Sequence, residues 1–250
     1  MGRSTWIAEA LVAAADDLRG EVGGMVFAEP VFHVYNPLAY AWEVHEAYLR
    51  RAAPEDPGGV VFLGMNPGPW GMAQTGVPFG EVSAVRDWMA LTGAVASPRA
   101  QHDRRPIEGF ECHRSEVSGR RLWGLVAERF GTLGAFAERH IVMNYCPLVF
   151  MEESGKNRTP DRLPARERAP LEEACDRHLR RVFEAIQPEW IVGVGAFAEK
   201  QARRVVGSTR DPESAAPRIG RILHPSPASP AANRGWAEQA VAQMEAMGVW

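Results

Sequence analysis

The sequence predicts an α/β fold, a three-layer α/β/α sandwich around a short, mostly parallel sheet of four strands. Four short apolar segments carry this prediction, at residues 60–64, 141–145, 190–194 and 219–223. Helical sequence separates each segment from the next, and strands that alternate with helices form parallel sheets whose two faces are covered. No repeat or low-complexity linker divides the 250 residues, so we expect a single domain over residues 1–250.

The helices are predicted from apolar residues that recur at spacings of three and four. The first, at residues 5–19, places Ile7, Leu11, Ala14 and Leu18 on one face. Further helices are expected at residues 39–52, 81–92, 117–130, 170–187, 196–206 and 232–247. Two long stretches, residues 93–116 and 151–169, are rich in Arg, Pro and Gly, and we expect them to be irregular surface chain.

Composition argues against several classes of protein. No apolar run approaches the roughly 18 residues that span a bilayer, so we expect no membrane partner. Glu9, Asp16 and Asp17 interrupt the segment in which a signal peptide would need its apolar region. The three cysteines lie far apart without a CxxC pair, which favours a reducing compartment over an iron–sulfur or zinc site. The stretch from His102 to His113 lacks ligand spacing, and we assign no metal.

Charge is distributed unevenly along the chain, although the net charge is only −3. The first 60 residues are acidic, whereas residues 154–170 and 203–234 are basic. The first basic segment contains Lys156, Arg158, Arg162, Arg166 and Arg168. This asymmetry suits a chain with one face toward a polyanion. An ordinary solvated surface is the alternative interpretation.

Three polar residues and a glycine lie at or just past the carboxyl ends of the four predicted strands. Asn66 lies just past the first strand, Asn144 ends the second, Gly195 follows the third and His224 follows the fourth. Ligands of open parallel sheets bind beyond the carboxyl ends of the strands. We therefore expect the two asparagines and the histidine to converge at one edge of the sheet.

The loop after the first strand, GMNPGPWGMAQTGVPFG at residues 64–80, is the most unusual segment. Between residues 68 and 80 it contains four glycines, and the whole loop has no charged residue. Its prolines restrict the backbone, and its glycines allow a flat ligand to approach closely. Surface loops are normally polar and variable, so this composition points to a function.

This loop, the NYCPL sequence at residues 144–148 and HPSPASPAANRGW at residues 224–236 together resemble the single-strand-selective monofunctional uracil-DNA glycosylases. The similarity runs from about Phe32 to the C-terminus, with the motifs in the order of the family. The resemblance implies a uracil-DNA glycosylase-like fold. It also implies hydrolysis of the N-glycosidic bond of uracil, and of 5-hydroxymethyluracil or related bases, in single- and double-stranded DNA. The product is an abasic site, as in base excision repair, and no cofactor is needed.

The resemblance also assigns roles to individual residues. Asn66 positions the hydrolytic water, and His224 hydrogen-bonds the uracil oxygen that gains negative charge. Asn144 reads the uracil edge with its carboxamide, and Phe79 stacks on the flipped base. The backbone of Met65 contacts a uracil carbonyl, and Gly68 leaves space beside the C5 edge, which correlates with acceptance of oxidised pyrimidines.

Each of these residues has an ordinary structural interpretation as well. Asn66 can cap a turn, Asn144 can bond to local backbone, and His224 and Phe79 can simply be packed. A non-catalytic reader of single-stranded nucleic acid on the same fold would keep Phe79 and the arginines without needing Asn66 or His224. A hydrolase acting on free nucleosides or nucleotides is a further alternative.

The resemblance implies that residues 225–234 enter the duplex as the base leaves. The DNA-contacting residues would be Pro225, Ser226, Pro227, Ala228, Ser229 and Arg234. Ala228 stands where better-known members of the family have an arginine, so we expect weak strand penetration and a preference for single-stranded or mismatched uracil. We expect a monomer in the cytoplasm, at the nucleoid, of a bacterium, or in the nucleus of a eukaryote.

Overall fold

A computed structural model describes residues 3–208 and 216–250 of the chain. At its centre is a sheet of four strands in the order β3-β2-β6-β7, in which every neighbouring pair is parallel. The strands are β2 (Val60–Gly64), β3 (His140–Asn144), β6 (Trp190–Val194) and β7 (Arg218–Ile222). All four predicted strands are confirmed to within one residue, and the sheet is wholly rather than mostly parallel.

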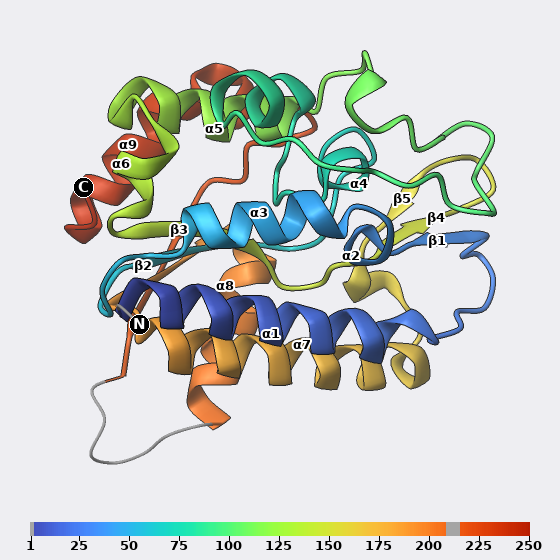
Figure 1. Ribbon diagram of the computed structural model, residues 1–250, viewed down its shortest axis with the longest axis horizontal. Coiled ribbons are helices and arrows are strands. Elements are labelled where there is room, and N and C mark those ends of the chain that lie inside the picture. The colour runs from blue at the N-terminus through green and yellow to red at the C-terminus, as the bar shows by residue number, and fades with distance from the viewer. Residues whose placement is uncertain (1–2, 209–215) are drawn as a thin grey trace.

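Helices cover both faces of this sheet, which confirms the predicted sandwich (Figure 1). On one side lie α5 (Val117–Phe130), α6 (Leu133–Ala137) and α9 (Trp236–Met247). On the other side lie α1 (Arg3–Gly23), α7 (Ala165–Ile186) and α8 (Ala196–Ser208). No helix in the described part of the chain is both long enough and apolar enough to cross a bilayer.

The edge of the sheet at β3 is closed by α3 (Trp42–Ala52). The buried Tyr48 hydroxyl donates to the carbonyl oxygen of Val142 at 2.8 Å and accepts from the nitrogen of the same residue at 3.2 Å. An exposed strand edge is a template for pairing with another chain, and this tyrosine removes part of it.

A second, smaller sheet was not predicted from the sequence. It is antiparallel, in the order β1-β4-β5, and consists of β1 (His33–Tyr35), β4 (Val149–Met151) and β5 (Asn157–Arg158). It lies beside the short helices α2 (Pro37–Tyr40) and α4 (Met72–Thr75) (Figure 1). Strands of two or three residues are too short to show a period in sequence.

Two expectations about irregular chain had different outcomes. Residues 93–116 are irregular apart from a single 3₁₀ turn at Gly109–Glu111 and an isolated bridge, which confirms the prediction. The prediction for residues 151–169 was wrong, because this segment includes β5, a 3₁₀ turn at Pro160–Arg162 and the first residues of α7. The helix begins at Ala165, five residues ahead of Pro170, so this proline lies inside the helix and not at its start.

The prediction of a helix at residues 81–92 was also wrong, because the helical segment is shorter. The chain makes a short turn that widens into a π-helical segment at Ala84–Trp88. The Glu81 carboxylate accepts from the nitrogen of Ala84 at 3.2 Å and so caps the turn. Ala90 has a φ of 50°, a left-handed conformation that ends the helix. The helix predicted at residues 39–52 is interrupted at Ala41, which separates α2 from α3.

Candidate active site

The ends of the parallel strands bring the predicted site residues to one edge of the sheet. Gly64 at the end of β2 pairs with Asn144 at the end of β3. Asn66 lies two residues after Gly64. Val194 at the end of β6 pairs with Ile222 at the end of β7, two residues before His224. The predicted convergence at the carboxyl ends of the strands is therefore confirmed for both asparagines and the histidine.

Asn144 presents an unpaired oxygen inside the protein. Its Nδ2 donates to Sδ of Met72 at 3.2 Å, whereas its Oδ1 is buried and accepts no hydrogen bond from the described residues. Buried polar atoms are almost always paired, so this oxygen is an acceptor available to a ligand N–H. Met72 is a site residue that sequence reasoning missed, because thioethers give no catalytic signal.

Gly64 allows the amide of Asn144 and the ring of Phe79 to meet. A side chain at Gly64 would collide with Oδ1 of Asn144 and would approach Cε2 of Phe79 to 2.5 Å. The unpaired acceptor therefore lies next to the aromatic ring with only a glycine between them.

Phe79 is held in a strained backbone conformation. Its φ is 53°, in the left-handed region that costs a residue with a side chain about 1–3 kcal/mol. The flanking chain holds it there, because Trp123 Nε1 donates to the carbonyl of Pro78 at 3.1 Å and Thr75 Oγ1 donates to that of Gly80 at 2.9 Å. The ring is only half-buried, and its centroid is 6.1 Å from that of His224.

The hydrogen bonding of His224 fixes which ring nitrogen carries the proton. The backbone N–H of Ser226 donates to Nδ1 at 3.1 Å, so Nδ1 must be unprotonated. Burial lowers the pKa of His224 below its ordinary value, which favours the neutral ring. A neutral ring with Nδ1 bare has its proton on Nε2. His224 is therefore a neutral hydrogen-bond donor on the side of the ring away from its own loop.

The amide of Asn66 is oriented in the same way, by a group that can only accept. Its Nδ2 donates to the carbonyl oxygen of Leu148 at 3.2 Å. This carbonyl faces the NH₂ group, so Oδ1 points elsewhere and accepts no hydrogen bond from the described residues. The neighbouring peptide is fixed as well, because the nitrogen of Cys146 donates to the carbonyl of Met65 at 2.9 Å.

The sequence predicts open space beside Gly68, but the Glu116 carboxylate fills the position that a side chain at residue 68 would take. A Cβ at Gly68 would lie 2.6 Å from the carboxyl carbon of Glu116. The same carboxylate accepts from the nitrogen of Trp70 at 3.3 Å, and burial raises the pKa of Glu116. The glycine thus makes room for Glu116. The contacts predicted between the base and Gly68 or the Met65 backbone stay predictions.

The loop at residues 225–234 is anchored from α5 by Arg121. Its Nη1 donates to the carbonyls of Pro225 at 3.0 Å and Ser226 at 3.4 Å, and its Nη2 donates to Oδ1 of Asn233 at 2.8 Å. Asn233 in turn donates from Nδ2 to the carbonyl of Pro227 at 2.9 Å. Ala228 and Arg234 are exposed on this loop. Sequence reasoning missed Arg121, which lies about a hundred residues away in the chain.

Most arginines of the predicted basic segment at residues 203–234 are neutralised. Arg203 and Arg221 share Glu199, and Arg204 pairs with Asp176. These three arginines fit the alternative interpretation, an ordinary solvated surface, and that this segment faces a polyanion stays a prediction. Its members Arg210, Asp211 and Glu213 lie outside the part of the chain that the structure describes.

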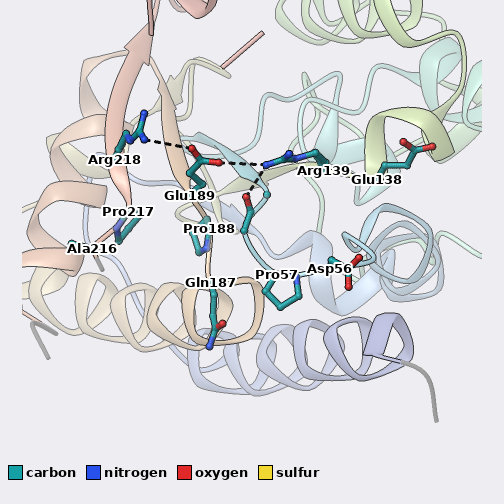
Figure 2. Close-up of a pocket in the computed structure, with 12 residues that line it drawn as sticks. Asp56, Pro57, Glu138, Arg139, Gln187, Pro188, Glu189, Ala216, Pro217 and Arg218 are labelled. Atoms are coloured by element: carbon teal, nitrogen blue, oxygen red, sulfur yellow. Dashed lines mark hydrogen bonds and ion pairs between the residues drawn. The ribbon is translucent and has the colours of Figure 1, made fainter. Parts of the chain in front are cut away.

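Arg218 lies at the opposite end of the sheet, in a cavity of about 660 Å³ (Figure 2). The residues that line this cavity immediately precede the strands. Glu189 pairs there with Arg218 at 3.7 Å and with Arg139 at 3.4 Å. Figure 2 shows these two ion pairs side by side. The cavity is separate from the site at the carboxyl ends.

Comparison with known proteins gives a consistent result. The family model of the uracil DNA glycosylase superfamily matches residues 53–244. The single-strand selective monofunctional uracil-DNA glycosylase of Rattus norvegicus is 44% identical over 243 residues, which are 97% of this chain and 86% of that protein. The Bos taurus protein of the same name is 45% identical, over 97% of this chain and 88% of its own length.

The fold is also shared with a solved structure, the crystal structure of wild-type Pedobacter heparinus SMUG2. The TM-score is 0.64 at 18% identity, with 94% of this chain and 98% of that chain covered. Fold, motifs and relatives agree. The chain belongs to the uracil-DNA glycosylase superfamily and, within it, to the family of single-strand selective monofunctional uracil-DNA glycosylases.

Proposed function

We propose that this DNA glycosylase hydrolyses the N-glycosidic bond between uracil and deoxyribose, in single-stranded DNA in preference to duplex. One observation carries the assignment to uracil: the buried, unpaired Oδ1 of Asn144 beside the Phe79 ring. Uracil offers a ring N–H next to a carbonyl. With the base stacked on Phe79, Asn144 Oδ1 accepts from that N–H, and its NH₂ group donates to the carbonyl.

Cytosine presents the reverse pattern at the same edge. It would be accepted only after the Asn144 amide had rotated to exchange its oxygen and nitrogen. The hydrogen bond from Nδ2 to Met72 opposes that rotation. A mismatched edge would leave buried polar groups unpaired, which costs about 1–3 kcal/mol for each group. Recognition of uracil thus rests on an amide held in one orientation.

His224 and Asn66 act on the two products of bond cleavage. As the bond between C1′ and the uracil nitrogen breaks, its electron pair passes to the base, and negative charge builds on a carbonyl oxygen of the uracil. The Nε2–H of His224 donates to that oxygen, and donors of this kind contribute a few kcal/mol to lowering the barrier. Oδ1 of Asn66 accepts from a water and holds it toward the cation-like C1′.

The water then adds its oxygen to C1′ and loses a proton to solvent, and the departing uracil anion takes up a proton from solvent, which gives an abasic deoxyribose and free uracil. An amide suits this step because orientation, rather than deprotonation, is what the water needs. No lysine nucleophile is among the assigned residues, so we propose simple hydrolysis without strand cleavage. We extend the substrate range to 5-hydroxymethyluracil on the family resemblance of the whole loop at residues 64–80.

An oligonucleotide with one uracil, treated with alkali to cleave abasic sites, tests the proposal. The same assay compares single strands, U·A and U·G duplexes, and a strand with 5-hydroxymethyluracil. Asn66→Ala and His224→Ala should each lose at least about a hundredfold in single-turnover rate. Binding to a single strand should be retained, because neither residue is expected to contact the backbone.

Full activity in both variants would refute the assigned roles. Binding without any uracil release by the wild-type protein would instead favour a non-catalytic reader. Equal rates on single-stranded and U·A substrates would contradict the strand preference. No release of 5-hydroxymethyluracil from its strand would refute the proposal that this base is also a substrate. Thermal unfolding of each variant serves as the control for folding.

A further inference from the structure

Trp70 lies in the same loop as Asn66, and its ring holds two guanidinium groups. Cζ of Arg114 lies 4.6 Å from the ring centroid, and Cζ of Arg105 lies 5.1 Å from it. A guanidinium that packs on an aromatic ring is fixed in position while its N–H groups stay available for other partners. The tryptophan therefore orients two positive charges beside the active-site loop.

Neither arginine is neutralised by the protein. Arg114 is exposed, and its side chain forms no ion pair or hydrogen bond with any described residue. Arg105 is half-buried and donates from Nη1 only to the carbonyl of Arg104, at 2.8 Å. Asp103, Glu108 and Glu111 are in the same stretch of chain, yet the described structure places none of them in an ion pair with either guanidinium. These arginines thus differ from Arg203 and Arg221, which share a glutamate.

This arginine pair is continuous with the active site. Asn157 donates from Nδ2 to the carbonyl of Pro67 at 3.1 Å and ties the turn between β4 and β5 to the active-site loop. Gly155 in that turn packs against Arg105, since a Cβ there would lie 3.5 Å from its Cζ. The exposed Lys156 follows directly and adds a third cation.

The arginine pair and the loop at residues 225–234 belong to different parts of the chain around the site. The turn that packs against Arg105 follows β4, the next strand along the chain after the edge strand β3, whereas the 225–234 loop follows β7, the other edge strand of the central sheet. A DNA strand that lies across the carboxyl ends of the sheet passes both. Ala228 puts no charge at the tip of the 225–234 loop, whereas a phosphate contact by the arginine pair would hold the strand without entering a duplex.

We propose that Arg105 and Arg114, oriented by Trp70, bind a backbone phosphate of the DNA strand that carries the target nucleotide. The proposal rests on the function proposed above, which brings that strand to this edge of the sheet. Guanidinium groups match phosphate oxygens through paired N–H donors. The carboxylate of Glu116, beside Trp70, accepts from the nitrogen of Trp70 and lies against the Gly68 backbone.

The test is equilibrium binding across a series of KCl concentrations. The probe is a single-stranded oligonucleotide with one tetrahydrofuran abasic analogue. Loss of one phosphate contact on a single strand makes the slope of log K against log salt less steep by roughly 0.7. We expect this change, with several-fold weaker binding at low salt, for Arg114→Gln. Arg114→Lys keeps the charge and should keep the wild-type slope.

Arg129→Gln is the matched control. Cζ of Arg129 also lies 4.6 Å from a tryptophan centroid, that of Trp250, and Arg129 faces His140 at the amino end of β3. The control should bind with the wild-type slope. A wild-type slope in Arg114→Gln, or an equal change in Arg129→Gln, would overturn the proposal. Because the assay needs no turnover, a protein that binds the probe but releases no uracil would refute only the catalytic proposal.

Discussion

At the scale of single residues, the site depends on groups whose orientation is imposed by a partner of fixed chemistry. The carbonyl of Leu148 can only accept, so it determines how the Asn66 amide faces. The N–H of Ser226 can only donate, so it determines which nitrogen of His224 is protonated. For Asn144 the partner is the Met72 thioether, a weak acceptor. This is the weakest of the three constraints, and it holds the amide that we propose distinguishes uracil from cytosine.

Met72→Leu tests that constraint. Leucine fills a similar volume, so the buried site should stay packed, but it cannot accept a hydrogen bond. A weak hydrogen bond contributes about 0.5–1.5 kcal/mol, and kcat/KM for uracil should fall by about two- to tenfold. Met89→Leu is the control, because Met89 is equally buried and has no contact with Asn144 in the described structure. Uracil release at the wild-type rate by Met72→Leu would show that the thioether does not orient the amide.

At the scale of elements, the loop at residues 225–234 is shaped by α5. Without Arg121 the carbonyls of Pro225 and Ser226 and the amide of Asn233 would lose a common partner. The backbone N–H of Ser226 also sets the tautomer of His224, so the anchor couples loop shape to the catalytic ring. Arg121 is therefore a positioning residue for the loop.

A double-mutant cycle separates the anchor from the tip of the loop. Ala228→Arg places a long cation at the exposed tip and should raise kcat/KM on a U·A duplex several-fold, with little change on single strands. If Arg121 holds the loop in position, Arg121→Met should abolish most of this gain when the two changes are combined. Equal gains from Ala228→Arg with and without Arg121 would show that the anchor is not needed for strand entry.

At the scale of the whole molecule, the topology was predictable and the supports of the site were not. Apolar strands that alternate with helices determine a parallel sheet, and this places Asn66, Asn144 and His224 at one edge. Met72, Glu116 and Arg121 act through contacts between segments far apart in the chain, which periodicity does not encode. The residue roles taken from the family resemblance stay predictions that the geometry supports.

Burial of histidines predicts how the whole fold responds to acid. His45, His140 and His178 are buried, and burial lowers the pKa of each to about 4, well below the ordinary 6.5. A depressed histidine pKa means that the unfolded chain binds more protons, so stability is complete above pH 6.5 and decreases as the pH falls below it. At pH 5 each histidine should lower the free energy of unfolding by about 2 kcal/mol. Urea unfolding at pH 7 and pH 5 measures the total loss.

His178→Gln keeps a donor for the carbonyl of Ala14 and should reduce the difference in unfolding free energy between the two pH values by about 2 kcal/mol. His113→Gln, at an exposed position, is the control and should leave that difference unchanged. Equal unfolding free energies of the wild-type protein at both pH values would contradict the argument, since all three rings would then have to titrate in the fold as they do in the unfolded chain.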